Sequence, residues 1–163
     1  MNNKANYWID RLDLQPHPEG GYYKEIFRSS TEVFRKNESE TKKIAFTSIY
    51  YLLETNDFSG FHRLKSDEIW YFHDGQPINI HILNADGSYK CVELSNSENG
   101  SLQAFIEPNC WFAAEIPSKL DFALVSCAVA PGFDFSEFEM ASKSSLNIIY
   151  PLQKNLIEKL CRF

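Results

Sequence analysis

The sequence predicts an all-β protein built as a sandwich or a barrel. Roughly eight to ten short runs rich in β-branched and aromatic residues alternate with turn signals at near-regular spacing, and helical patterns occur only towards the ends. Phe, Tyr and Trp make up 15% of the chain, a content that suits pleated sheet surfaces and apolar pockets. At 163 residues the chain fits a single domain spanning residues 1–163.

The charge balance limits the partners that we expect. The net charge is −6 and the pI is near 5.2, which argues against nucleic acid or an anionic membrane as the main partner. No apolar run approaches the length of a membrane span, and the N-terminal stretch MNNKANYWID carries no signal core. The cysteines lie far apart without a C-x-x-C pair, so we expect reduced, mostly buried thiols and a cytoplasmic location.

The first elements follow from periodicity and turn chemistry. Residues 6–12 predict a short amphipathic helix, because Trp8, Ile9 and Leu12 form an apolar stripe. The next segment, residues 14–21 (LQPHPEGG), contains prolines and glycines that exclude a regular helix or a central strand. It is therefore expected to turn the chain into its first strand.

That first strand is expected over residues 21–30. Alternation places Tyr23 and Phe27 on one face of it and Arg28 on the other. The polar and charged residues 31–43 predict an exposed loop.

The following run, residues 44–54 (IAFTSIYYLLE), predicts a central strand with Tyr50 on one face and Ile49 and Tyr51 on the other. Residues 146–163 predict a helix with Pro151 near its start and an apolar stripe of Leu152, Leu156, Ile157 and Leu160. The remaining strands are expected at 77–83 and 88–94, joined by an Asn-Ala-Asp-Gly turn, and at 103–107, 112–115 and 121–129.

The stretch from Gly60 to Gly75, GFHRLKSDEIWYFHDG, predicts two strands joined by a tight turn as a hairpin. With that turn, one surface carries His62, Leu64, Glu68, Trp70 and Phe72. A histidine and a carboxylate on an apolar face need partners, because a buried unpaired polar group is costly. They either satisfy each other or line a ligand cavity.

This stretch resembles the first motif of the cupin superfamily. His62, Glu68 and Gly75 fit its spacing, and the segment Pro108-Asn-Cys-Trp-Phe-Ala113 aligns with the second motif. More of the chain is similar to one branch, the cupin-5 family of unknown function. The similar segments are residues 14–30, 61–75, 111–114 and 125–138.

The resemblance implies a double-stranded β-helix, the RmlC-like jelly roll or cupin barrel, with short terminal helices. It also implies a homodimer and an internal cavity that takes a small-molecule ligand. The resemblance to the cupin-5 branch does not imply an established reaction. The nearest functional analogy is to the dTDP-sugar 3,5-epimerases, cupins that use acid–base chemistry without a metal.

Many cupins bind a transition metal through three histidines and a glutamate. Here His62 and Glu68 remain, but Leu64 and Ala113 stand at the other ligand positions and offer no lone pair. We therefore expect no metal cofactor. If a metal were bound, its ligands would be His62, Glu68 and Gln103. His73 has the opposite parity to Glu68 and is expected to point away from the cavity.

The favoured interpretation is metal-independent, isomerase- or epimerase-like acid–base chemistry on a sugar or sugar-nucleotide-like ligand. A histidine near neutral pKa beside a carboxylate is suited to take a proton from carbon next to a carbonyl. The expected catalytic residues are His62, Glu68 and Tyr50, with Tyr23 as the other candidate for the phenol acid. Arg28 or Arg63 would hold an anionic group. The expected ligand-binding residues are Arg28, Trp70, Phe72, Gln103, Trp111, Phe112 and Tyr23.

Two alternatives remain open: a cupin that binds a small molecule without catalysis, and a metal-dependent enzyme with a depleted ligand set. His17 and Glu19 either form a turn beside the pocket or close over its mouth. Phe133 or Phe135 is expected to pack inward at the rim. Cys110 and Cys127 are expected to pack as small apolar residues.

Overall fold

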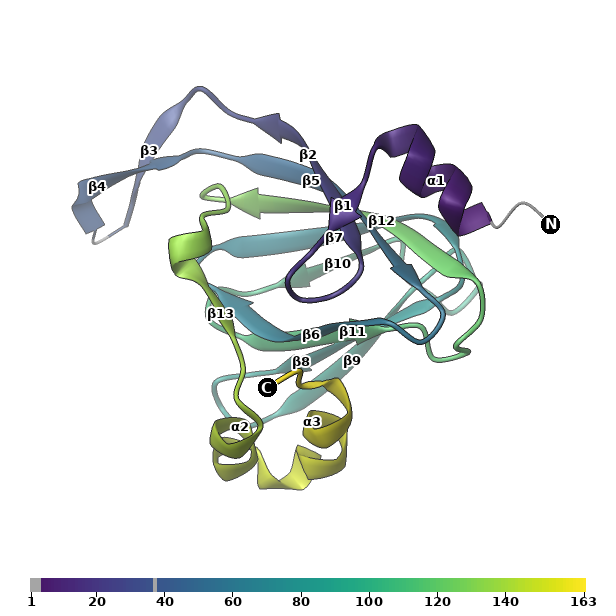
Figure 1. The fold of residues 1–163 in the computed structure, drawn as a ribbon. Helices are drawn as coiled ribbons and strands as arrows, with labels where there is room; N and C mark the ends of the chain where they lie inside the picture. Colours follow the sequence, from purple (N-terminus) through teal and green to yellow (C-terminus); the bar gives the residue numbers. More distant parts are fainter. Residues whose placement is uncertain (1–3, 37) are drawn as a thin grey trace.

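The fold is seen in a computed structural model that describes residues 4–36 and 38–163 (Figure 1). Within these residues the strands form a six-stranded sheet, a five-stranded sheet and a separate two-stranded sheet. The two larger sheets lie face to face (Figure 1), and their strands pair antiparallel. This arrangement confirms the all-β jelly roll with short terminal helices.

The first sheet contains, in spatial order, β1 (Gln15–Pro16), β2 (Tyr22–Arg28), β5 (Thr47–Glu54), β12 (Phe122–Ala130), β7 (Asp67–Gly75) and β10 (Gln103–Ile106). The second sheet contains β13 (Phe138–Met140), β6 (Phe58–Leu64), β11 (Trp111–Glu115), β8 (Ile78–Leu83) and β9 (Tyr89–Leu94). The small sheet pairs β3 (Glu32–Arg35) with β4 (Glu38–Ile44).

The main core fills the space between the two larger sheets. Most inward strand positions contribute apolar side chains, and the alternate positions point outward. Each such side chain, once fully buried, stabilises the fold by about 1.5–3 kcal/mol. The largest buried members are Tyr51, Trp70, Phe112, Leu53, Ile78, Ile80 and Leu94.

Helices cover the outer faces of the sheets (Figure 1). The N-terminal helix α1 (Lys4–Leu12) packs on the first sheet, where Leu52 and Phe122 lie beneath it. The C-terminal helices α2 (Lys143–Ile149) and α3 (Lys154–Leu160) pack on the second sheet. No helix in the described ranges is long and apolar enough to cross a membrane.

The C-terminal helix predicted over 146–163 is instead broken at Pro151. This proline begins a single helical turn (Pro151–Gln153) between α2 and α3, because its ring cannot continue the hydrogen bonds of the preceding helix. Leu152 is consequently 91% exposed, although it was expected in the apolar stripe, whereas Ile157 and Leu160 are buried as expected.

The predicted hairpin between Gly60 and Gly75 is wrong. Strands form where expected, but β6 belongs to the second sheet and β7 to the first, so the turn after Leu64 carries the chain across the sandwich. His62 pairs with Phe112 of β11 and not with Trp70. His62 and Glu68 still face the same interior, because the inner faces of both sheets point into it.

The predicted exposed loop at 31–43 is also wrong. Its described residues form the antiparallel strands β3 and β4, which project beyond the large sheets (Figure 1). Ion pairs explain how so polar a segment becomes ordered, because Glu137 accepts hydrogen bonds from Arg35 at 2.9 Å and lies 2.9 Å from the Lys43 ammonium. The Arg35–Glu137 contact is a bidentate pair, the most directional type of ion pair.

A β-bulge changes the predicted faces of β2. The pairing with β5 shifts register between Glu25 and Phe27. An extra residue reverses the alternation beyond it. Arg28 therefore lines the interior cavity, and Phe27 is 52% exposed on the outside.

Candidate functional site

A cavity of about 430 Å³ opens at one end of the sandwich. Its rim is aromatic, and the rings of Phe133 and Phe135 lie 4.8 Å apart. Both side chains border the cavity, as expected for at least one of them. The lining residues are His17, Glu19, Tyr23, Glu25, Arg28, Ile49, His62, Leu64, Glu68, Cys127, Val129, Phe133, Asp134, Phe135 and Phe138.

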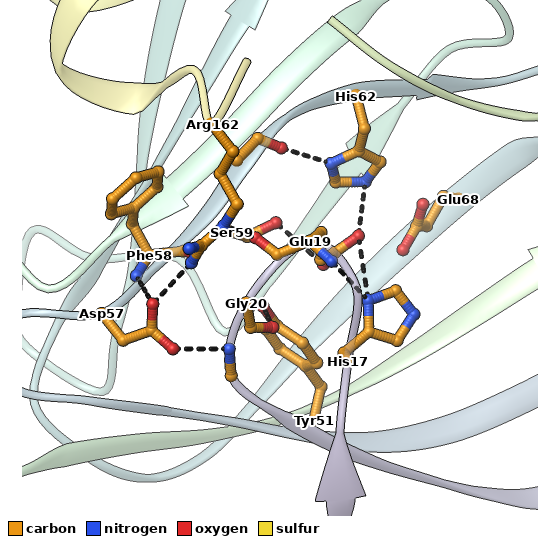
Figure 2. A network of polar contacts seen from close by, with 12 residues as sticks. His17, Glu19, Gly20, Tyr51, Asp57, Phe58, Ser59, His62, Glu68 and Arg162 are labelled. Carbon is orange, nitrogen blue, oxygen red and sulfur yellow. Dashed lines mark hydrogen bonds and ion pairs between the residues drawn. The ribbon is translucent and has the colours of Figure 1, made fainter.

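Glu19 lies at the centre of the polar contacts in this cavity (Figure 2). Its Oε1 atom accepts a 2.8 Å hydrogen bond from the Ser59 hydroxyl. Its Oε2 atom lies 3.1 Å from His62 Nε2 and 3.6 Å from His17 Nδ1. The carboxyl partner of His62 is therefore Glu19, and the pairing of His62 with Glu68 considered from the sequence does not occur.

The contact between Glu19 and His62 contains a shared proton. His62 Nδ1 lies 2.7 Å from the Gly60 carbonyl oxygen, which can only accept, so Nδ1 carries a hydrogen. A carboxylate and a bare ring nitrogen would repel each other at 3.1 Å, so a second hydrogen must lie between them. Burial lowers the pKa of His62 to about 4 and raises the pKa of Glu19. The proton thus resides mainly on Glu19, and the pair carries no net charge.

His17 presents its other ring nitrogen to the cavity. Its Nδ1 atom accepts a 3.3 Å hydrogen bond from the backbone N–H of Glu19, so the neutral ring carries its hydrogen on Nε2. Burial lowers the pKa of His17, which favours this neutral form. None of the described residues bonds to Nε2, and Figure 2 shows this atom on the same side of the network as Glu68.

Glu68 is a buried carboxyl group with one oxygen unsatisfied. Its Oε1 atom accepts a 2.9 Å hydrogen bond from the Trp70 indole, while Oε2 has no hydrogen-bond partner among the residues described. Burial is the largest cause that raises the pKa of Glu68 to about 8. The Cys127 thiol makes only a weak polar contact with this carboxyl, and burial raises the pKa of the thiol, so Cys127 packs as expected.

The loop that carries Glu19 is held by the C-terminus. The Arg162 guanidinium donates to the Glu19 carbonyl at 2.5 Å and to Asp57 Oδ1 at 2.5 Å, and Asp57 Oδ2 accepts from the Gly21 N–H at 2.7 Å (Figure 2). Gly20 has a φ of +115°, and a Cβ atom there would lie 2.0 Å from Arg162 Nη2. Glycine is therefore required at this position.

The predicted site residues divide into three groups. His62, Glu68, Arg28 and Tyr23 line the cavity. Trp70 and Phe112 lie behind this lining: the Trp70 indole supports Glu68, and the Phe112 ring centroid is 4.1 Å from that of His62. The residues that do not reach the cavity are Tyr50, Phe72, Gln103, Trp111 and Arg63.

Strand alternation explains most of these exclusions. Tyr50 points out of β5 towards the cluster under α1, while Ile49 lines the cavity, so the position of Tyr50 does not support a role as the acid. Trp111 likewise points outward, beneath the Arg63 guanidinium at 4.4 Å. Gln103 is exposed at the edge strand β10 and cannot substitute for a metal ligand.

His73 and Phe72 on β7 also lie outside the cavity lining. His73 contacts the Ser126 hydroxyl and lies outside the cavity lining, in agreement with its predicted parity. Phe72 packs against the main core, although it was expected to line the pocket.

A family model described as "Cupin superfamily (DUF985)", Cupin_5, matches residues 6–141. The chain belongs to the Cupin_5 family. It is similar to a hypothetical protein from Leishmania major, with 32% identity and a TM-score of 0.87 over 96% of this chain and 98% of that one. Protein SO0799 from Shewanella oneidensis is 35% identical, with a TM-score of 0.87 over 99% of both chains.

Two comparisons are more distant, one with a sequence and one with a solved structure. The uncharacterized protein YML079W of Saccharomyces cerevisiae is 29% identical over 151 residues, which cover 79% of this chain and 71% of that protein. An oxalate decarboxylase from Bacillus subtilis has a TM-score of 0.55 at 14% identity, over 91% of this chain and 37% of the enzyme chain. At that identity the likeness concerns the fold alone.

The interior of this Cupin_5 chain does not fit the metal centre of many cupins. Leu64 lines the cavity, and Ala113 faces outward into the cluster beneath the C-terminal helices, so the inward side chain beside His62 is Phe112. Both nitrogens of His62 are already engaged, by Gly60 and Glu19. In the described ranges no group of three or more His, Cys, Asp or Glu side chains is placed to hold a metal ion.

Sequence reasoning did not identify several parts of this site. Glu19 and His17 were considered as a turn or a lid, although Glu19 is the buried centre of the network. The sequence feature that could have identified Glu19 is a carboxylate in a proline- and glycine-rich segment that also carries a histidine. Arg162 lies 143 residues away from Glu19 along the chain, and no pattern in the sequence joins them.

Proposed function

We propose that the protein binds a small polar carbonyl compound in its cavity and transfers protons to and from carbon, as an isomerase or epimerase does. The observation that carries this proposal is the unpartnered Oε2 atom of the buried Glu68, in the cavity that also contains His17. A carboxyl group with a pKa of about 8 is a much stronger base than an ordinary carboxylate.

Each polar residue receives a role in this reaction. Glu68, once ionised, takes a proton from the carbon next to the carbonyl, and the same proton or one from solvent returns to carbon. The Nε2–H group of the neutral His17 donates a hydrogen bond to the carbonyl oxygen and stabilises the negative charge that develops there. Glu19 and His62 are positioning residues, because the Glu19 backbone N–H donates to His17 Nδ1 and His62 in turn contacts the Glu19 carboxyl group.

The proposed chemistry is tested by exchange of solvent deuterium into uncharged ketoses and their phosphate esters, followed by loss of the α-proton signals in NMR spectra. We expect exchange to accelerate about tenfold per pH unit up to about pH 8 and then to level off, because the ionised form of Glu68 is the active one. Glu68→Gln should slow exchange at least about 100-fold.

Glu139→Gln is the matched control, because Glu139 is an exposed carboxylate that pairs with Arg63 outside the cavity. This control should exchange at the rate of the unchanged protein. If no compound exchanges, or if Glu68→Gln leaves the rate unaltered, the acid–base function is wrong. Binding without exchange would instead favour the non-catalytic alternative, which is supported by how fully His62 is satisfied within the protein.

We also propose that the protein is a homodimer in the cytoplasm. Exposed aromatic side chains on β2 and on the projecting β3–β4 hairpin support self-association. Phe27 and Phe34 are 52% and 55% exposed, and the rings of Phe27 and Phe46 lie 5.9 Å apart. Exposed apolar patches of this kind commonly mark protein interfaces.

A further inference from the structure

The charges around the cavity indicate which class of ligand it accepts. Arg28 is the lining arginine, and it is already paired. Its Nε and Nη2 atoms donate to the two carboxylate oxygens of Glu25 at 2.9 and 2.7 Å, and both Nη atoms lie 3.4 Å from the Phe133 carbonyl oxygen. The bidentate clamp for a ligand anion that the sequence suggested is therefore occupied by a side chain of the protein itself.

The remaining charges at the mouth are also unfavourable for an anion. Asp134 borders the same opening, and hydrogen bonds from Ser136 hold its pKa below the ordinary value, so it is ionised at neutral pH. Among the lining residues at the mouth, the formal charges of Glu25, Arg28 and Asp134 sum to −1. Deeper in the cavity, His17, the Glu19–His62 pair and most of the Glu68 population carry no charge at pH 7.

The aromatic lining adds a second, independent indication. The His17 ring lies edge-on to Tyr23 at 4.5 Å and to Phe138 at 6.0 Å, and Phe135 packs edge-on against Phe133 at 4.8 Å. Such rings offer apolar faces to the C–H face of a sugar or another compact polar ring. The cavity volume of about 430 Å³ lies within the range of small-molecule sites.

We propose that the ligand of this cavity is an uncharged molecule of sugar size that carries hydroxyl and carbonyl groups, and that phosphate- or carboxylate-bearing analogues are rejected. The inference rests on the proposed function for the carbonyl group and on the paired Arg28 for the lack of charge. A desolvated anion here would lack a counter-charge, which is costly in a partly buried site.

The test is a binding measurement, which is independent of turnover. Fructose and fructose 6-phosphate, with a further panel of free sugars and their phosphate esters, are compared at pH 7 by ligand-observed NMR. Leu64→Trp, which places a larger side chain in the cavity, defines the signal that depends on this site. We expect the free sugars to bind at least about tenfold more tightly than their phosphate esters.

A second variant keeps the test decisive if Leu64→Trp does not fold. Glu25→Gln releases the guanidinium of Arg28 and replaces the lining carboxylate with an amide of nearly the same size. We expect the affinity for fructose 6-phosphate to rise about tenfold in this variant, and to return to its original value in the double variant with Arg28→Gln.

The inference is overturned if a phosphate ester binds as tightly as its free sugar, if no free sugar binds, or if Glu25→Gln leaves the ester affinity unchanged. These outcomes differ from failure of the proposed function. Tight binding of free sugars without deuterium exchange would remove the chemistry and leave the ligand class intact. Exchange that occurs only with phosphate esters would support the proposed chemistry and overturn the proposed ligand class.

Discussion

Replacing Glu19 with alanine should lower the free energy of unfolding by about 3 kcal/mol at pH 7, whereas Glu19→Gln should cost less than about 1 kcal/mol. Alanine leaves Ser59 and His62 without their partner in a buried setting, and each unsatisfied group costs about 1–3 kcal/mol. Glutamine reproduces the protonated carboxyl group. Its oxygen can accept from Ser59, and its amide group can donate to the ring nitrogens of His62 and His17.

Urea denaturation of the three proteins measures this difference, provided that the slope of the transition is unchanged. Glu139→Ala is the matched control, because it removes an exposed, ion-paired carboxylate from the surface and should change stability by less than about 0.5 kcal/mol. If glutamine destabilises the protein as much as alanine does, then Glu19 is ionised in the native state and the shared proton lies on His62.

Replacing Glu68 with glutamine should make stability less sensitive to pH. The carboxyl group titrates near 4.5 in the unfolded chain and near 8 in the folded protein, so between these values the folded state binds more protons. The stability of the unchanged protein therefore falls as the pH rises through this window. Each pKa unit corresponds to about 1.4 kcal/mol, so relative to Glu68→Gln the unchanged protein should lose about 4 kcal/mol between pH 5 and pH 8.

The comparison with Glu68→Gln separates the pH dependence of stability that is due to Glu68 from the pH dependence that is due to the histidines. Burial lowers the pKa of His62 to about 4, so that group destabilises the fold only as the pH falls below its ordinary value of 6.5, and it does so equally in both proteins. Denaturation curves at pH 5, 6.5 and 8 provide the measurement. A constant difference between the two proteins across this range would show that Glu68 has an ordinary pKa.

Local patterns in the sequence were sufficient to predict which way most side chains face. Alternation along β6 and β7 placed His62 and Glu68 towards the interior, and the same rule placed His73 outside the cavity. These assignments hold whichever strands pair, because alternation is a property of a single strand. The pairing itself was wrong, since a short turn can join strands of one sheet or cross between two.

Features that depend on distant parts of the chain could not be predicted. The bulge in β2 is a property of its pairing with β5, and it moves Arg28 into the cavity. The partner of His62 comes from a segment far earlier in the chain, and Arg162 holds that segment from the opposite terminus. Burial sets the pKa of Glu68, and burial is decided only by the complete fold.

We expect most Glu68 side chains to keep their proton at neutral pH inside the cavity, and the proposed chemistry depends on this state. Carbon-13 NMR of the glutamate side-chain carboxyl signals across a pH titration measures this directly, and Glu68→Gln identifies the signal by its disappearance. We expect the Glu68 signal to titrate at about pH 8. A Glu68 signal that titrates near the ordinary value of 4.5 would contradict it.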